Sequence, residues 1–105
     1  MATIDEVLSK CKTLLERQYG SQFQGLVLYG SVARQQAGPD SDIDLLVLLG
    51  ARFDYFRELR RIIEVLYPLQ LETDHLISAK PVLLDEFERG RIQLYRNARR
   101  EGVMV

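Results

Sequence analysis

The spacing of apolar residues changes along the chain, and each spacing predicts a different kind of element. From Ile4 to Leu15, apolar side chains recur every three or four residues, as they do on one face of a helix. Thr3 and Glu6 fit a capping box at the start of this helix, and Gly20 is a natural end. The sequence therefore predicts an amphipathic N-terminal helix.

Two short apolar runs in the middle of the chain have the length and composition of strands. They cover Phe23–Tyr29 and Asp42–Leu49. Between them, Gly30 and Ser31 are expected to open a short helix, and a break is expected over residues 37–41, which contain glycine and proline. This order predicts a strand, a glycine–serine turn, a short helix and a second strand.

The second half of the chain continues the alternation of helices and strands. Helical spacing predicts a helix over Asp54–Tyr67, which Pro68 should end because proline lacks the N–H that a helix needs. A third strand is expected over Gln70–Ile77, a last helix over Pro81–Arg89, and a short edge strand around residues 92–94. The pattern is that of an α/β (α+β) domain in which helices flank a small sheet.

Composition limits the classes of protein that this chain can form. Its 105 residues suffice for one domain and are too few for two, and 47% of them are hydrophobic. A net charge of −1 gives no overall field that would attract nucleic acid or a membrane surface. We expect no signal peptide and no transmembrane helix, because no apolar run approaches about 18 residues. Cys11 is the only cysteine, so it cannot form an internal disulfide; it is expected in the core, and a reducing cytoplasm fits.

The candidate chemistry lies in Gly30-Ser31, followed after ten residues by Asp42-Ile43-Asp44. A glycine lets backbone N–H groups approach a phosphate, and a helix that starts there adds partial positive charge. In a strand, residues i and i+2 point the same way with Cα atoms roughly 6.6 Å apart. Two carboxylates so placed can share two Mg²⁺ ions, the arrangement used for displacement at phosphorus. The alternative is an ordinary turn followed by two aspartates that face solvent.

These residues resemble a known family. Leu28–Arg34 followed by Ser41–Val47 is similar to the minimal nucleotidyltransferases of the DNA polymerase β superfamily, and the likeness extends more weakly over nearly the whole chain. Phe87–Tyr95 resembles the helix and glycine-then-Leu-Tyr segment with which members often end. One departure is Gln35, where the family usually has glycine. The resemblance implies a polymerase β-like fold with a mixed sheet.

The resemblance also implies roles for the acidic residues. Asp42 and Asp44 would hold two Mg²⁺ ions that bridge the triphosphate and the attacking oxygen. Family members carry a third carboxylate on a later strand, where it completes the acceptor-side metal and helps to deprotonate the incoming hydroxyl. Asp74 and Glu72 have the same strand parity, so either could be this residue. Asp74 fits the family segment better.

The phosphate-binding roles fall on the turn between the first two strands. Ser31 and the Gly30 backbone would bind the β- and γ-phosphate oxygens of ATP. Arg34 could add positive charge there, or it could be an ordinary surface residue of the helix. His75 is the only histidine, and without Cys or His companions it is expected to pack or to form a hydrogen bond rather than to bind zinc.

A partner is implied by the small size of the chain. Short proteins that resemble it are typically antitoxins paired with a HEPN-domain ribonuclease toxin, and they transfer AMP from ATP to a tyrosine hydroxyl of the toxin. Two alternatives are transfer to a small molecule and neutralisation by contact alone. The five arginines between Arg89 and Val105 could form the docking surface or a solvated basic tail.

Overall fold

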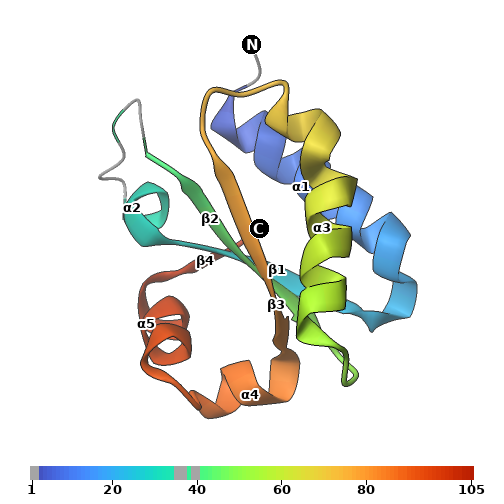
Figure 1. Cartoon of the computed structure of the whole chain (residues 1–105). Helices are drawn as coiled ribbons and strands as arrows, with labels where there is room; N and C mark the ends of the chain where they lie inside the picture. Colours follow the sequence, from blue (N-terminus) through green and yellow to red (C-terminus); the bar gives the residue numbers. More distant parts are fainter. Residues whose placement is uncertain (1–2, 35–37, 39–40) are drawn as a thin grey trace.

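One mixed sheet organises the protein. The computed structural model describes residues 3–34, 38 and 41–105, and in that part of the chain four strands lie in the order β3-β2-β1-β4 (Figure 1). Strand β1 is antiparallel to both β2 and β4, whereas β2 and β3 are parallel. The predicted class, a small mixed sheet flanked by helices, is confirmed. In chain order the elements are α1 (Ile4–Tyr19), η1 (Gly20–Gln22), β1 (Phe23–Tyr29), α2 (Gly30–Ala33), β2 (Ile43–Leu49), α3 (Tyr55–Gln70), β3 (Ile77–Leu83), α4 (Leu84–Arg89), α5 (Gln93–Glu101) and β4 (Val103–Met104).

The first helix forms as its sequence predicts. The hydroxyl of Thr3 accepts a hydrogen bond from the backbone N–H of Glu6 at 3.2 Å, which satisfies one of the free donors of the first turn. The helix ends at Gly20, whose φ of 56° favours glycine. Its apolar face packs on the sheet, and Cys11 is fully buried there. In the described ranges, no helix is both long enough and apolar enough to cross a membrane.

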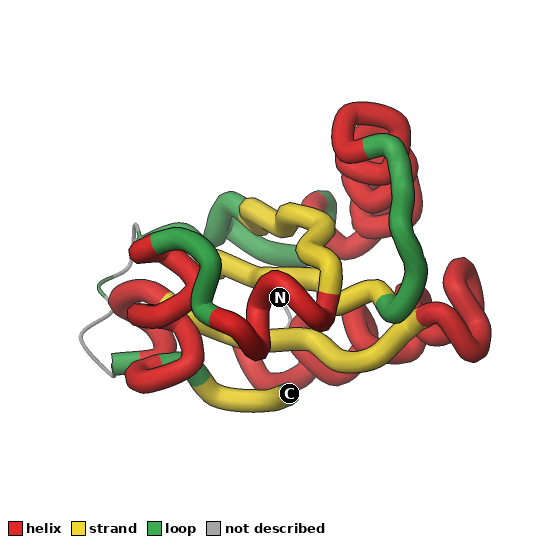
Figure 2. The backbone as a smooth tube through the Cα atoms, turned by 90° about the horizontal axis from the view of Figure 1, so that it is seen from below, coloured by secondary structure: helices red, strands yellow, loops and turns green. Residues whose placement is uncertain are grey.

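The sheet separates two cores. Side chains of one face pack with α1 and α3, and side chains of the other face pack with α4 and α5. Helices α1 and α3 lie side by side (Figure 1). Figure 2 shows the strands running between helical segments. Because side chains alternate along a strand, the even-numbered residues of β2 and β3 point toward α4 and α5. This face, which we call the α4–α5 face, contains Leu46, Leu48 and Val82 of the second core.

The third strand is not where the sequence predicts it. Residues 71–76 form a loop, and β3 runs over Ile77–Leu83 instead of Gln70–Ile77. The side-chain amide of Gln70 holds the loop, because it donates to the carbonyl of His75 at 2.9 Å and accepts from the N–H of Ile77 at 2.8 Å. The hydroxyl of Thr73 accepts from the N–H of His75. These side chains satisfy backbone groups that a strand would have paired with a neighbouring strand.

Two predictions that were based on prolines, the end of α3 and the start of the last helix, are wrong. Pro68 does not end α3, which continues to Gln70, because a proline in the last turn removes a single hydrogen bond while Leu69 is buried in the core. Pro81 does not start a helix but lies within β3. That strand is at the edge of the sheet and pairs only with β2, so its outer side needs no N–H donor. The helix that follows begins at Leu84.

The C-terminal segment is a helix followed by a strand, not the expected edge strand around residues 92–94. Leu94 and Ala98 lie four residues apart on one face of α5, where Ala98 joins the core of the α4–α5 face. The side chain of Gln93 donates to Asn97 at 3.0 Å, an i,i+4 pair that supports the helix. Two apolar residues, Ile92 and Leu94, were too few to distinguish the periodicity of a strand from that of a helix.

Candidate active site

The glycine turn and the acidic strand meet because of the register between β1 and β2. Tyr29, the last residue of β1, is paired with Asp44 of β2, so Gly30 begins directly beside Asp44. Gly30 has a φ of 78°, and a Cβ at this position would collide with Oδ2 of Asp44. Both the backbone conformation and the carboxylate therefore require glycine here. The glycine–serine turn and the acidic strand, which ten residues separate in the sequence, therefore lie next to each other in the fold.

Asp42 lies close enough to Asp44 for its charge to act on that carboxyl. Asp44 is half-buried in β2 on the α4–α5 face, and Asp42 is exposed just before the strand. Burial raises the pKa of Asp44, the charge of Asp42 raises it further, and the charge of Lys80 lowers it. Two carboxylates that repel each other and offer oxygen ligands fit a hard cation such as Mg²⁺, which would relieve the repulsion.

Among the described residues, no third carboxylate joins this pair. Across residues 3–34, 38 and 41–105, no group of three or more His, Cys, Asp or Glu side chains is placed to hold a metal ion. Asp74 is exposed in the loop before β3, not in a strand beside Asp44. The alternative, Glu72, forms an ion pair with Lys10 of α1 at 2.9 Å. The expectation that Asp74 or Glu72 extends from a strand next to Asp44 is wrong, because the strand starts later.

The β3 residues that do lie beside Asp44 are not acidic. Ser78 is the register partner of Asp44, and Lys80 follows two residues later on the same face. The sequence Ile77–Leu83 contains no aspartate or glutamate. Sequence reasoning missed Ser78 and Lys80 because it ended the strand where β3 begins. The available signal for a strand there was the apolar, partly β-branched set Ile77, Val82 and Leu83.

The loop before β3 is attached to the start of β2. The N–H of Ile43 donates to the carbonyl of Leu76 at 2.8 Å. A ring nitrogen of His75, Nδ1, lies 2.7 Å from the carbonyl of Ser41, to which it must donate. His75 is therefore a hydrogen-bonded structural residue, as its sequence context predicts. It holds the segment that leads into Asp42.

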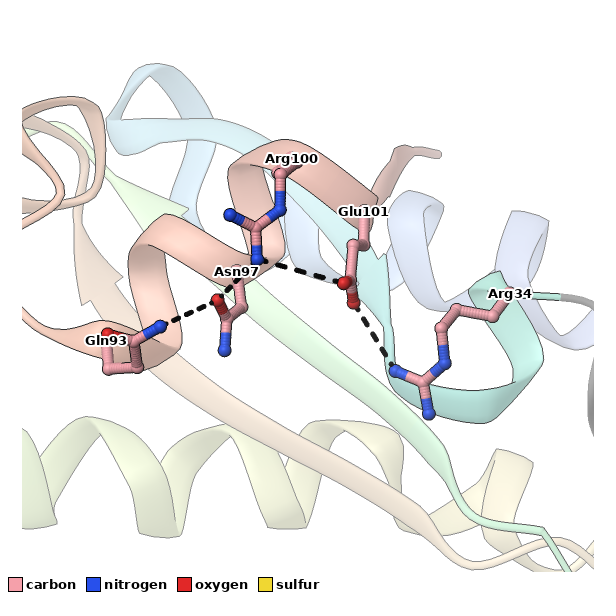
Figure 3. Close-up of polar contacts among 5 residues, drawn as sticks. All are labelled: Arg34, Gln93, Asn97, Arg100 and Glu101. Carbon is pink, nitrogen blue, oxygen red and sulfur yellow. Dashed lines mark hydrogen bonds and ion pairs between the residues drawn. The ribbon is translucent and has the colours of Figure 1, made fainter.

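Helix α5 forms a wall beside the glycine turn, and the sequence did not predict it. Figure 3 shows Arg34 facing Glu101, with Nη1 and Oε2 3.5 Å apart. Further along α5, Arg100 donates to Asn97 at 3.0 Å. A cavity of about 160 Å³ lies between the turn and this helix, and its lining includes Tyr29, Gly30, Arg34, Leu94, Asn97, Ala98 and Glu101.

The structure describes only some of the remaining residues that were predicted to act at the turn. Arg34 is exposed and ends α2, where its backbone N–H donates to the carbonyl of Gly30 at 3.2 Å. Ser31 lies in the first turn of α2, and its side chain is outside what the structure describes. Gln35, the departure from the family pattern, also lies outside the described residues.

Comparison with known proteins agrees with this geometry. A family model described as a nucleotidyltransferase domain matches residues 8–100. One similar solved structure is a chain in the crystal structure of a mutant of the toxin-antitoxin MntA-HpeT. The likeness has a TM-score of 0.60 at 16% identity and covers 100% of this chain and 72% of that chain. At this identity the likeness shows a shared fold. No curated protein matches the chain.

Proposed function

The chain belongs to the nucleotidyltransferase domain family, and we propose that it transfers AMP from ATP to a hydroxyl group at the Gly30 turn. The observation that carries this proposal is the close contact between Gly30 and Asp44. This contact places two kinds of group side by side. One is a set of backbone N–H donors that suit phosphate oxygens, and the other is a pair of carboxylates that suit a divalent cation. Nucleotidyl transfer requires both at the same phosphates.

The chain's residues would divide the work at this turn. Asp42 and Asp44 would hold Mg²⁺, which supplies charge stabilisation at the phosphates and polarises the attacking oxygen. The described residues bring no third carboxylate to this pair, so other ligands would come from ATP and water. Gly30 and Ser31 would bind the β- and γ-phosphates, and Arg34 would add charge. The acceptor oxygen bonds to the α-phosphorus, the bond to pyrophosphate breaks, and the acceptor proton passes to water.

We further propose that the acceptor is a tyrosine hydroxyl of a partner HEPN-domain toxin, and that the protein is an antitoxin. The motifs resemble those of short antitoxins, and the similar solved structure is part of a toxin-antitoxin.

Neutralisation of the partner by contact alone is the second candidate. It is favoured by one observation, the absence of an acidic residue from Ile77–Leu83 beside Asp44. In that case the carboxylates would have no role in neutralisation. The two candidates differ in whether the partner gains a nucleotide.

The test is mass spectrometry of a HEPN-domain partner after incubation with the protein, ATP and Mg²⁺. We expect the mass of one or more AMP groups on a tyrosine peptide, and no addition when Asp42→Asn replaces the wild type. A matched control is Asp85→Asn, because Asp85 is an exposed aspartate in α4 that pairs with Arg89. Full neutralisation by Asp42→Asn with an unmodified partner would favour contact alone and contradict the enzymatic proposal.

A further inference from the structure

Lys80 is a charged residue on the same face of the sheet as Asp44. The parallel register pairs Asp44 with Ser78 and Leu46 with Lys80, so Lys80 is displaced from Asp44 by one step along that face. Side chains of paired residues in neighbouring strands point to the same side. The Lys80 side chain therefore lies on the α4–α5 face, the same face as Asp44, and it comes from a strand rather than from a loop.

Among the described residues, none fixes the Lys80 side chain by a hydrogen bond or ion pair. It is half-buried, yet no hydrogen bond or ion pair joins it to another residue of the described chain. Lys10, in contrast, pairs with Glu72 at 2.9 Å. The register with β2 places Lys80 opposite Leu46, two residues after Asp44. Because no described residue holds the Lys80 ammonium in a hydrogen bond or ion pair, its three N–H donors remain available to an anionic ligand.

We propose that Lys80 is a further substrate-binding residue of this site and that it contacts the phosphate oxygens of the bound nucleotide. This inference rests on the proposed nucleotidyl transfer. A lysine is a compact positive charge on a flexible stem, which suits a triphosphate whose oxygens move during reaction. Asp42 and Asp44 would attract the cation, and Lys80 would attract the anion that accompanies it.

From the position of Lys80 we expect its removal to affect cation affinity and nucleotide affinity differently. Without nucleotide, Lys80 repels any cation that approaches Asp44, so its removal should not weaken cation binding and should slightly strengthen it. With nucleotide, the loss of a charged contact to phosphate should weaken binding about 10- to 100-fold. A lysine that only supports the fold would change both affinities in the same direction or neither.

The experiment compares Lys80→Met with wild type by calorimetry, using two probes. One probe is α,β-methylene-ATP with Mg²⁺, which binds but cannot transfer AMP, and the other is Mn²⁺ alone. We expect a loss of about tenfold or more for the analogue, an Mn²⁺ affinity equal to or above that of wild type, and partial recovery in Lys80→Arg. Lys12→Met is the matched control, because Lys12 is a half-buried lysine of α1, on the opposite side of the sheet.

Three results would count against the assignment, and they are distinguishable. Wild-type affinity for the analogue in Lys80→Met overturns the role of Lys80 alone. Loss of both Mn²⁺ and analogue binding assigns Lys80 to the fold instead. Failure of wild type to bind the analogue, with Mn²⁺ binding intact, overturns the proposed nucleotidyl transfer and the role of Lys80 with it.

Discussion

Replacing Gly30 with alanine tests whether the glycine turn and the acidic strand are built around one contact. Gly30 has a φ of 78°, where a side chain costs about 1–2 kcal/mol. The new Cβ would also collide with Oδ2 of Asp44. Because the aspartate side chain is short and can turn aside in part, this collision adds only about 1 kcal/mol, the lower end for overpacking. We expect the free energy of unfolding to fall by about 2–3 kcal/mol in Gly30→Ala.

Gly20→Ala separates the two contributions. Gly20 has a φ of 56°, and nothing lies within 4 Å of a Cβ built on it, so this variant measures backbone strain alone. We expect a loss of about 1–2 kcal/mol by urea unfolding followed by circular dichroism. In an Asp44→Ala background, Gly30→Ala should cost no more than Gly20→Ala, because the colliding oxygen is gone.

Two outcomes would refute this reasoning. If Gly30→Ala costs the same with and without Asp44, the carboxylate does not occupy the space beside the turn. If Gly30→Ala costs less than Gly20→Ala, the positive φ at Gly30 is not required by the fold. Nucleotide affinity provides a second readout, since a displaced Asp44 should also weaken the binding of α,β-methylene-ATP with Mg²⁺.

The remaining predictions concern Asp44 and Cys11. Asp44→Asn should lower AMP transfer by about 100-fold or more, measured with ATP labelled on the α-phosphate, since it removes an ionised ligand from the reacting phosphates. Burial and Asp42 raise the folded-state pKa of Asp44, so the wild type should lose stability as pH rises through that pKa, and Asp44→Asn should not. A stability difference independent of pH in urea titrations would contradict this. Burial raises the pKa of the Cys11 thiol to about 12, so iodoacetamide at pH 8 should modify the native protein far more slowly than the urea-unfolded chain.

The sequence pattern was sufficient to predict where the candidate site lies. The Gly30 turn and the Asp42–Asp44 pair follow from the sequence, because the strands on both sides are strongly apolar and the residues between them are strong turn formers. The contact between Gly30 and Asp44 depends only on pairing two strands that are close in the chain. Antiparallel pairing of neighbouring strands is common enough to be expected.

The third strand is harder because its pairing is not local. Strand β3 is parallel to β2 and reaches it through α3, so its register depends on how that helix crosses the sheet. Its sequence contains Lys80 and Pro81, which are both unfavourable in a central strand. The edge position removes the penalty for proline. A one-dimensional pattern contains no information about which strand becomes an edge.

The sequence by itself determined the features that depend on periodicity and on neighbouring residues. These are the first helix with its cap at Thr3, the strands β1 and β2, the glycine turn and the acidic pair. Only the tertiary structure decided which residues lie near this pair. It assigned Asp74 to a loop, brought Ser78 and Lys80 to the face of the sheet that carries Asp44, and placed Glu101 of α5 opposite Arg34. The physical reason is that a strand's register and a short helix's stability come from contacts with distant segments, and those contacts override weak local preferences.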